Sequence, residues 1–299
     1  MQDLPVSSIE DVERALQAHH YIADRSLATT IFLALTLDKP LLLEGEAGVG
    51  KTEVGKVLAE ILDTRLIRLQ CYEGIDVNNA VYEWAYAKQM LHIRLLEAAG
   101  TNRDETEREI YSHQFLVKRP LLQAIESDGA RPPVLLIDEI DRSDDEFEAF
   151  LLELLSDFQI SIPEIGTIKA GRPPVVIITS NRTREIHDAL KRRCLYFWID
   201  YPSVETEYEI VKARIPEVPE KMARQVSQFI GNVRRLDLYK LPGIAETLDW
   251  TRCLMALGER ELEDGAVQAT LGSIVKYQED LERLRGERAR ELLARAVNA

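Results

Sequence analysis

The chain has 299 residues, and its 37 Lys and Arg against 51 Asp and Glu give a formal net charge of −14. A chain of this length is predicted to form one large or two modest domains with a substantial hydrophobic core. Its content of 45% hydrophobic and 29% charged residues is ordinary for a globular protein and excludes wholesale disorder. The acidic balance disfavours a general nucleic-acid binder, which needs a cationic face towards phosphate, although it does not exclude a local basic patch.

The N-terminal stretch is polar and acidic, unlike a signal peptide. Apolar runs all fall short of the about 18 residues that cross a bilayer. We therefore expect a soluble, cytoplasmic protein without stable membrane insertion. The cysteines Cys71, Cys194 and Cys253 stand far apart and form no metal-ligand pair, so we expect them to be buried apolar residues in a reducing compartment.

The first part of the chain is predicted to alternate between helices and strands. Helices are expected over residues 7–20 and over Asp24–Leu37, where apolar positions recur at helical spacing. Leu41–Leu43 is expected to be a short buried strand. A glycine-rich turn then leads into a helix with an apolar stripe from Val54 to Leu62, and Leu66–Cys71 is the next expected strand.

The stretch from Tyr72 to Pro132 is long and polar over Thr101–Glu109, with helices expected on both sides of the polar part. Beyond it, continuous apolar runs occur at Val134–Ile137 and Val175–Thr179, and a weaker one at Tyr196–Ile199. Such runs are typical of parallel strands that are buried on both faces of a sheet.

Between these runs, Phe158–Ile162 and Gly166–Ala170 are expected to form a small hairpin. Strands that alternate with helices predict an α/β fold, a doubly wound parallel sheet. After residue 202 no apolar strand run returns, which predicts a smaller, all-helical C-terminal domain. We expect the two domains to comprise residues 1–205 and 206–299.

A glycine-rich motif occupies the turn after the first expected strand. Its residues are Gly45, Glu46, Ala47, Gly48, Val49, Gly50, Lys51 and Thr52. The motif fits G-x-x-x-x-G-K-[ST] without departure and lies, as that motif requires, between a strand and a helix. Main-chain N–H groups of such a loop surround phosphate oxygens at the positive end of the helix. Lys51 is expected to neutralise the β- and γ-phosphates of a nucleotide, and the Thr52 hydroxyl to bind Mg²⁺.

Polar residues follow two of the later apolar runs. The run Val134–Ile137 ends in Asp138 and Glu139, so the carboxylates reach the carboxyl end of a central strand. There Asp138 is expected to hold the metal ion and Glu139 to activate the attacking water. Asn181 follows the next run and is expected to hold that water or to sense the γ-phosphate, although Ser-Asn after a strand is often only a turn.

Arginines mark two further candidates for catalysis. Arg192 and Arg193 precede the last expected strand, where clustered arginines usually form a solvated face. A sharper hypothesis is an arginine finger that enters a neighbouring subunit's site, with Arg193 the first choice and Arg192 the second. Arg252 is expected near a helix start in the helical domain, from which it would reach back to the γ-phosphate, although an ordinary surface arginine is a nearly equal alternative.

These motifs, in this order, resemble those of AAA+ ATPases, and more narrowly the MoxR family and its CoxD-like group. The resemblance rests on Leu41–Lys56, Asp138–Arg142, Glu146–Phe150, Leu190–Tyr196 and Trp198–Pro202. It implies Mg-ATP hydrolysis in a homo-oligomeric ring, typically a hexamer, with ATP between subunits. It also implies chaperone-like maturation of a metalloenzyme client, such as molybdenum–copper carbon monoxide dehydrogenase, with a von Willebrand factor A protein as partner.

The same resemblance implies roles for individual residues. Lys51 and Thr52 match Walker A, Asp138 and Glu139 match Walker B, and Asn181 matches sensor 1. Arg193 lies in the finger region, and Arg252 is the nearest match to sensor 2. Tyr21, Ile22 and Ala23 would line the adenine, although helix packing accounts for them equally well.

Two other classes of function remain as alternatives. One is a nucleic-acid-associated AAA+ ATPase of the clamp-loader or helicase-loader type, which the charge of −14 disfavours. The other is a P-loop GTPase or small-molecule kinase. The guanine-reading motif N-K-x-D is absent from the sequence, which disfavours GTP as the substrate.

Overall fold

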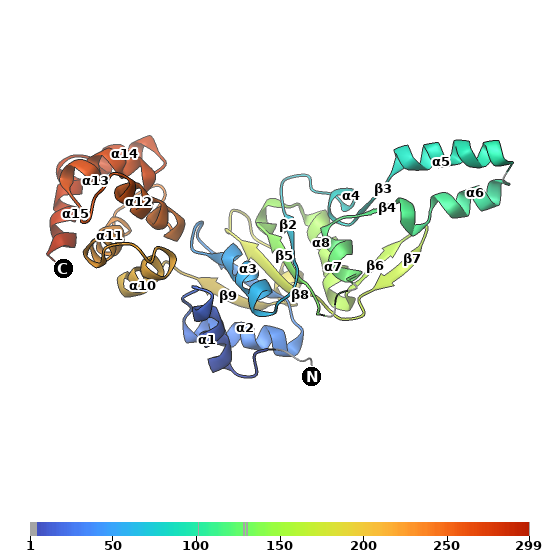
Figure 1. The fold of residues 1–299 in the computed structure, drawn as a ribbon, viewed down its shortest axis with the longest axis horizontal. Coiled ribbons are helices and arrows are strands. Elements are labelled where there is room, and N and C mark those ends of the chain that lie inside the picture. Colours follow the sequence, from blue (N-terminus) through green and yellow to red (C-terminus); the bar gives the residue numbers. More distant parts are fainter. Residues whose placement is uncertain (1–4, 101, 128, 130, 299) are drawn as a thin grey trace. The chain divides into compact units, whose positions relative to one another are not determined.

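The computed structural model describes residues 5–100, 102–127, 129 and 131–298 (Figure 1). These residues form two compact units that do not follow chain order. Among the described residues, the first unit contains those of 5–8, 29–44 and 55–197. The second contains Ile9–Ala28, Gly45–Val54 and residues 198–298. A domain boundary after residue 205 stays a prediction.

A five-stranded sheet forms the centre of the α/β fold. Its strands are β2 (Leu66–Gln70), β5 (Val134–Asp138), β8 (Val175–Ser180), β1 (Leu41–Gly45) and β9 (Leu195–Ile199), in this spatial order. Strand β2 pairs in parallel with β5, β5 with β8, and β8 with β1. All residues of β1 and β5 are buried, as the continuous apolar runs predicted. The prediction of a parallel P-loop sheet with helices is confirmed.

Helices of the first unit pack against this sheet. They include α3 (Lys51–Ile61), α7 (Pro120–Ile125), α8 (Asp145–Asp157), α9 (Asp188–Lys191) and α2 (Arg25–Leu37), of which α2 and α3 start in the second unit. A Cβ on Gly55 of α3 would lie 3.1 Å from Cδ1 of Leu136 on β5, so the helix lies close against the middle of the sheet. The hairpin predicted after α8 is confirmed as β6 (Gln159–Ile162) and β7 (Gly166–Lys169), an antiparallel pair.

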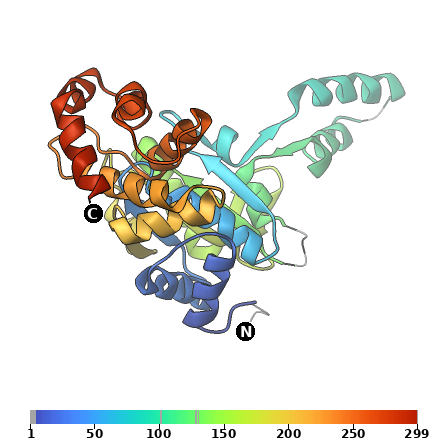
Figure 2. The same cartoon turned by 60° about the vertical axis from the view of Figure 1, so that its left-hand side comes forward.

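The stretch from Tyr72 to Pro132 contains more helices and strands than its sequence pattern predicted. It contains α4 (Val77–Ala80), β3 (Tyr82–Trp84), α5 (Tyr86–Ala99), α6 (Arg103–Ile110), a 3-10 turn (His113–Phe115) and β4 (Leu116–Lys118) before α7. The helices expected on both sides of the polar part are confirmed as α5 and α7. The polar part itself forms α6, and neither this helix nor the antiparallel pair β3–β4 was predicted. Strands of three residues are too short to show a period. Within the first unit, α5 and α6 extend away from the sheet (Figure 1 and Figure 2).

The second unit is helical, as predicted for the C-terminal part of the chain. Its helices are α1 (Ile9–Ala18), α10 (Val204–Arg214), α11 (Glu220–Val233), α12 (Ile244–Ala256), α13 (Asp264–Thr270), α14 (Gln278–Leu284) and α15 (Glu287–Val297), with a 3-10 turn at Leu271–Ser273. Trp250 lies at the centre of their core, fully buried and 5.0 Å from the Phe229 ring. Its indole Nε1 donates a hydrogen bond to Thr270 Oγ1 at 2.7 Å.

The structure shows how deeply the cysteines are buried. Cys71 is buried, and burial raises the pKa of its thiol to about 12, whereas Cys253 is exposed, so its predicted burial is wrong.

None of the helices among the described residues is long and apolar enough to span a membrane. Within the same part of the chain, His, Cys, Asp and Glu form no group of three or more that could hold a metal ion.

A buried ion pair links three helices of the second unit. Arg234 at the end of α11 donates from Nη1 and Nη2 to the two carboxylate oxygens of Glu207 on α10, at 2.6 and 2.8 Å. Thr247 on α12 donates to the same carboxylate at 2.6 Å, and Arg234 Nε donates to the Pro242 carbonyl at 2.8 Å. Burial raises the pKa of the Glu207 carboxyl, while the Arg234 guanidinium acts to lower it.

Replacing Arg234 with Ala is expected to lower the free energy of unfolding by about 3–5 kcal/mol, because the Glu207 carboxylate would stay buried without a cation. Urea denaturation at pH 7 measures the loss. The matched control is Arg224→Ala on the same helix, whose partner Glu220 is 64% exposed, and it is expected to change stability little. Equal losses for the two variants would contradict a special role for the buried pair.

Candidate functional site

Three central strands end at the same edge of the sheet in the first unit. Strands β1, β8 and β5 are parallel neighbours, with Glu44 opposite Ser180 and Ile137 opposite Ile178. Their carboxyl ends therefore lie together, as in other open α/β sheets, where ligands bind at this edge. Asp138 ends β5, Asn181 follows β8, and the glycine-rich turn follows Glu44 of β1.

The glycine-rich turn belongs to the second unit and closes around Lys51. Gly48 has a φ of 81°, a left-handed conformation that side chains rarely adopt, which explains glycine at this position. The Lys51 ammonium donates to the carbonyl oxygens of Gly45 and Glu46 at 2.7 and 2.6 Å, and the residue is only 6% exposed. Lys51 and Thr52 begin α3, so the turn meets the positive end of that helix.

The start of α12 lies directly against this turn. Ile244 N–H donates to the Gly48 carbonyl at 2.9 Å. A Cβ on Gly243 would lie 2.9 Å from the Ala47 oxygen and from main-chain carbons of Gly48, so only glycine fits there. Glu246 caps the start of this helix, because its carboxylate accepts the Gly243 N–H at 3.0 Å. The helical part of the second unit is therefore in contact with the turn through main-chain atoms.

Tyr21 lies on another side of the same turn. A Cβ on Gly50 would be 3.8 Å from the Tyr21 ring. Burial raises the pKa of the Tyr21 hydroxyl, and the nearby carboxylates of Glu53 and Asp24 raise it further, so the phenol stays neutral at pH 7. Ile22 and Ala23 follow it and are half-buried. An adenine-lining role for Tyr21, Ile22 and Ala23 stays a prediction.

Asp138 is buried at the end of β5 and both of its carboxylate oxygens accept hydrogen bonds. Thr179 Oγ1 on β8 donates to Oδ1 at 2.5 Å. Arg68 on β2 donates to Oδ2 from Nε at 3.0 Å and from Nη2 at 2.5 Å. Thr179 and Arg68 are site residues that the sequence analysis missed, because each lies on another strand about 40 or 70 positions away in the chain.

Glu139 has a different environment from its neighbour. Its φ of 56° is left-handed, and its N–H donates to Thr179 Oγ1 at 2.9 Å. The Glu139 side chain is 32% exposed, and its Oε2 accepts from Arg142 Nη1 at 3.2 Å. The two adjacent acidic residues are thereby separated into one buried and one partly exposed carboxylate.

The loop that carries Asn181 is held by a carboxylate that was not singled out from the sequence. Asp141 is 3% exposed and accepts from the Asn181 N–H at 3.1 Å. It also accepts from Thr183 N–H at 2.9 Å and from Thr183 Oγ1 at 2.6 Å. Asp141 therefore fixes the main chain of the loop after β8, on which Asn181 is half-buried.

The three candidate arginines differ in what they contact. Arg193 donates from Nε to Ser156 Oγ at 2.7 Å and from Nη1 to the Ala189 carbonyl at 3.1 Å. Arg192 is exposed, and its side chain forms no hydrogen bond or ion pair with the residues that the structure describes. Arg252 lies in the second half of α12, exposed and 3.2 Å from Asp249, so its predicted place near a helix start is wrong.

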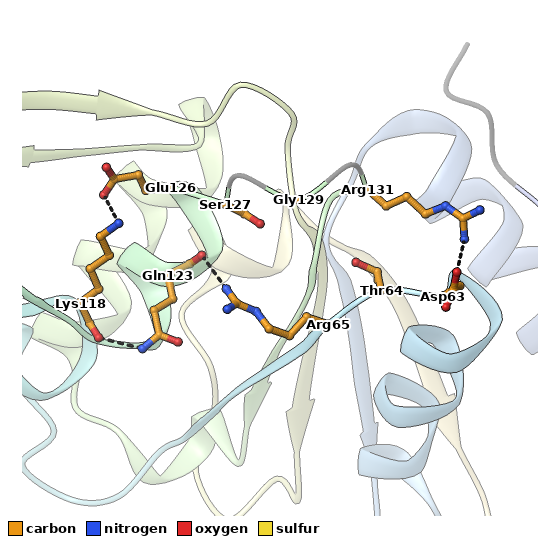
Figure 3. A pocket seen from close by; sticks show the side chains of 9 residues that line it. All are labelled: Asp63, Thr64, Arg65, Lys118, Gln123, Glu126, Ser127, Gly129 and Arg131. Atoms are coloured by element: carbon orange, nitrogen blue, oxygen red, sulfur yellow. Dashed lines mark hydrogen bonds and ion pairs between the residues drawn. The ribbon is translucent and has the colours of Figure 1, made fainter.

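A cavity of about 760 Å³ lies at the opposite edge of the sheet, near the amino ends of β2 and β5 (Figure 3). Its lining side chains are mostly charged or polar: Asp63, Thr64, Arg65, Lys118, Gln123, Glu126, Ser127 and Arg131, with Gly129. Internal pairs such as Lys118–Glu126 and Arg131–Asp63, both at 3.3 Å, hold much of this charge. None of the predicted site residues lines it.

Fold and sites together define an α/β protein with a P-loop and with an acidic pair at the carboxyl edge of the sheet. The family described as AAA domain (dynein-related subfamily) matches residues 40–194, more than half of the chain. The chain belongs to this family.

The chain is also similar in part to proteins of known sequence and to solved structures. The chain is 23% identical over 246 residues to an uncharacterized protein of Staphylococcus aureus strain NCTC 8325 / PS 47, covering 80% of this chain and 84% of that one. A protein of strain bovine RF122 / ET3-1 is 22% identical over the same length and coverage. The RuvB Holliday junction branch migration motor of Thermotoga maritima is 17% identical, with 90% of this chain and 72% of that chain covered and a TM-score of 0.45.

Gly243→Ala is expected to weaken ATP binding by about tenfold or more, because the added Cβ would displace either the glycine-rich turn or the start of α12. Titration with a fluorescent ATP analogue measures the affinity. Gly265→Ala is the matched control, since a Cβ there meets no atom within 4 Å. Wild-type affinity in the Gly243 variant would show that the contact between α12 and the turn has no bearing on the nucleotide.

Proposed function

We propose that this chain is a Mg²⁺-dependent ATP hydrolase. The observation that carries the proposal is the separation of Asp138 and Glu139 into two environments. The Asp138 side chain is 3% exposed and hydrogen-bonded at both oxygens, whereas the Glu139 side chain is 32% exposed. A buried, fixed carboxylate suits a metal ion, and a partly exposed one suits proton transfer from water.

Residues of the glycine-rich turn would bind the triphosphate. Main-chain N–H groups of Gly48 and Gly50 and the Lys51 ammonium are the donors, at the positive end of α3. Lys51 would exchange its carbonyl partners, Gly45 and Glu46, for phosphate oxygens. Since a phosphate carries full negative charge, it is the better partner for the ammonium.

The residues present fit a magnesium ion. Thr52 supplies a hydroxyl and Asp138 a carboxylate, which are the hard oxygen ligands that Mg²⁺ prefers alongside phosphate and water. The Asp138 carboxylate already lies against a cation, the Arg68 guanidinium, which fits a position for positive charge. Mg²⁺ in this place would neutralise charge that develops on the phosphate oxygens.

Glu139 and Asn181 would act on the attacking water. The Asn181 amide orients the water, and the Glu139 carboxylate accepts its proton as the oxygen bonds to the γ-phosphorus. The bond between the γ-phosphorus and the bridging oxygen breaks, which releases ADP and inorganic phosphate. Arg142, which lies 3.2 Å from Glu139, would keep that carboxylate oriented before the reaction.

Two substitutions separate binding from hydrolysis. Lys51→Ala is expected to abolish ATP binding, because the turn loses its only ammonium. Glu139→Gln is expected to keep ATP affinity within about twofold and to lower turnover by about 10²–10⁴-fold, the contribution of a general base. Calorimetric titration and phosphate release measure the two properties. Turnover at the normal rate in Glu139→Gln would show that another group is the base.

We further propose that copies of this chain form a hexameric ring and that an arginine from a neighbouring copy completes each site. Arg192 is the better supported finger, because it is exposed and unengaged by the described residues, while Arg193 is held by Ser156 and Ala189. This reverses the order of preference that the sequence suggested. Arg252, paired with Asp249, has no part in the proposed mechanism.

Arg192→Ala is expected to lower ATP turnover by about 10³-fold, the lower range for arginine fingers, and Arg193→Ala by much less. Mixing Arg192→Ala chains with Lys51→Ala chains should restore part of the phosphate release, since each chain lacks a different half of the shared site. Failure to restore activity at any mixing ratio would contradict a finger that acts between subunits.

The proposed client and partner rest on the resemblance to MoxR-type motifs. We propose chaperone-like remodelling in the cytoplasm that matures a metalloenzyme, such as molybdenum–copper carbon monoxide dehydrogenase, with a von Willebrand factor A protein as partner. What supports a contact surface is α5, which exposes Met90, Leu91 and Leu95 on a projecting pair of helices. A group of exposed apolar side chains on one helix is typical of a surface that binds another protein.

A further inference from the structure

Arg68 contacts the carboxylate proposed to hold the metal ion. Strand β2 lies beside β5 in register, with Arg68 opposite Leu136 and Gln70 opposite Asp138. Side chains alternate along β2, so Arg68 and Gln70 share the exposed face, while Ile67 and Leu69 are buried. This register brings the guanidinium to Asp138 on the neighbouring strand.

The contact is unequal in its burial and specific in its geometry. The Asp138 side chain is 3% exposed, but the Arg68 side chain is 48% exposed. Two guanidinium nitrogens, Nε and Nη2, donate to the single oxygen Oδ2, and Thr179 engages Oδ1. Arg68 therefore reaches from the solvent-exposed face of the sheet to one defined oxygen of a buried carboxylate.

A metal ion bound to Oδ2 of Asp138 and this guanidinium require the same oxygen. Magnesium binds its oxygen ligands at about 2.0–2.1 Å, and a guanidinium bound to that oxygen would lie close to the ion with a charge of the same sign. Thr179 donates a hydrogen bond to the other oxygen, Oδ1, so neither oxygen is without a donor. At Oδ2 the two cations are thus in competition.

Arg68 has other hydrogen-bond partners when a metal ion binds Oδ2 of Asp138. Nη2 also donates to Gln70 Oε1 at 2.5 Å, and half of the side chain is in solvent. Arginine in such a place keeps its charge and moves at small cost, since water replaces the lost hydrogen bonds. Release of Asp138 therefore needs no rearrangement of the strands.

Resting on the proposed function, we propose that Arg68 is a positioning residue that occupies Oδ2 of Asp138 until a divalent cation displaces it. It keeps the buried carboxylate oriented, and it raises the concentration of Mg²⁺ that the site requires. Arg68 thereby makes metal entry a separate event from binding of the nucleotide by the glycine-rich turn.

The test measures metal affinity directly, with Mn²⁺ as the probe. Full-length chain is saturated with a non-hydrolysable ATP analogue, and free Mn²⁺ is measured by electron paramagnetic resonance. Arg68→Ala is expected to bind Mn²⁺ about fivefold more tightly than wild type, the effect of removing one partly exposed ion pair. Arg68→Lys, which keeps the charge but has one nitrogen instead of a fork, is expected to lie between them.

Arg65→Ala is the matched control for charge. Arg65 precedes the same strand but points into the cavity at the opposite edge of the sheet, where Nη2 lies 3.5 Å from the Gln123 carbonyl (Figure 3). It is expected to leave Mn²⁺ affinity unchanged. Equal tightening in both variants would mean that only net charge matters and would overturn the proposal.

Other outcomes are equally decisive. Unchanged or weaker Mn²⁺ binding in Arg68→Ala, with wild-type thermal unfolding in EDTA, would overturn the competition. Weaker binding of the analogue without metal would instead assign Arg68 to the phosphates and would also overturn it. If the wild-type chain takes up no Mn²⁺ with the analogue, the proposed function itself fails, a result distinct from the others.

Discussion

The hydroxyl of Thr179 organises both acidic residues of the site at once. It donates to Asp138 Oδ1 and accepts from the Glu139 N–H, so one atom fixes the carboxylate of the first residue and the main chain of the second. The parallel register of β5 and β8 brings this hydroxyl to the end of the neighbouring strand. Because Thr179 is 1% exposed, water cannot replace these bonds, and their loss would leave buried polar groups unsatisfied.

Arginines keep the two carboxylates in their separate environments. Arg68 lies against the buried Asp138, and Arg142 against the partly exposed Glu139. A chain with a net charge of −14 would otherwise place adjacent negative charges at the edge where a triphosphate is proposed to bind. Paired cations on both carboxylates lower this local repulsion.

The second unit links its helical core to the glycine-rich turn through consecutive contacts. The buried pair Glu207–Arg234 holds the Pro242 carbonyl, and the next residue, Gly243, lies against Gly48. Main-chain atoms in contact at this distance cannot move aside as the end of a flexible side chain can. If the turn changed its conformation on binding a phosphate, the start of α12 would therefore have to move as well. In this way a nucleotide would bias the conformation of the helical part of the unit.

The sequence by itself determined the elements whose signals are local. The apolar runs at Leu41–Leu43 and Val134–Ile137 appear as buried strands, and the motif from Gly45 to Thr52 spans the end of β1, the turn and the first two residues of α3. Periodicity and turn chemistry act between neighbours in the chain, so they are readable without tertiary structure. The acidic pair was found for the same reason, since it directly follows a run of apolar residues.

Tertiary structure alone decided which residues meet across strands. Arg68 and Thr179 reach Asp138, and Asp141 reaches Asn181, because strands far apart in the chain become neighbours in one register. Alternation along a strand tells which face a side chain occupies, but it carries no information on which strand lies beside it. For that physical reason the acidic pair was predictable, whereas the cation and the hydroxyl that hold it were not.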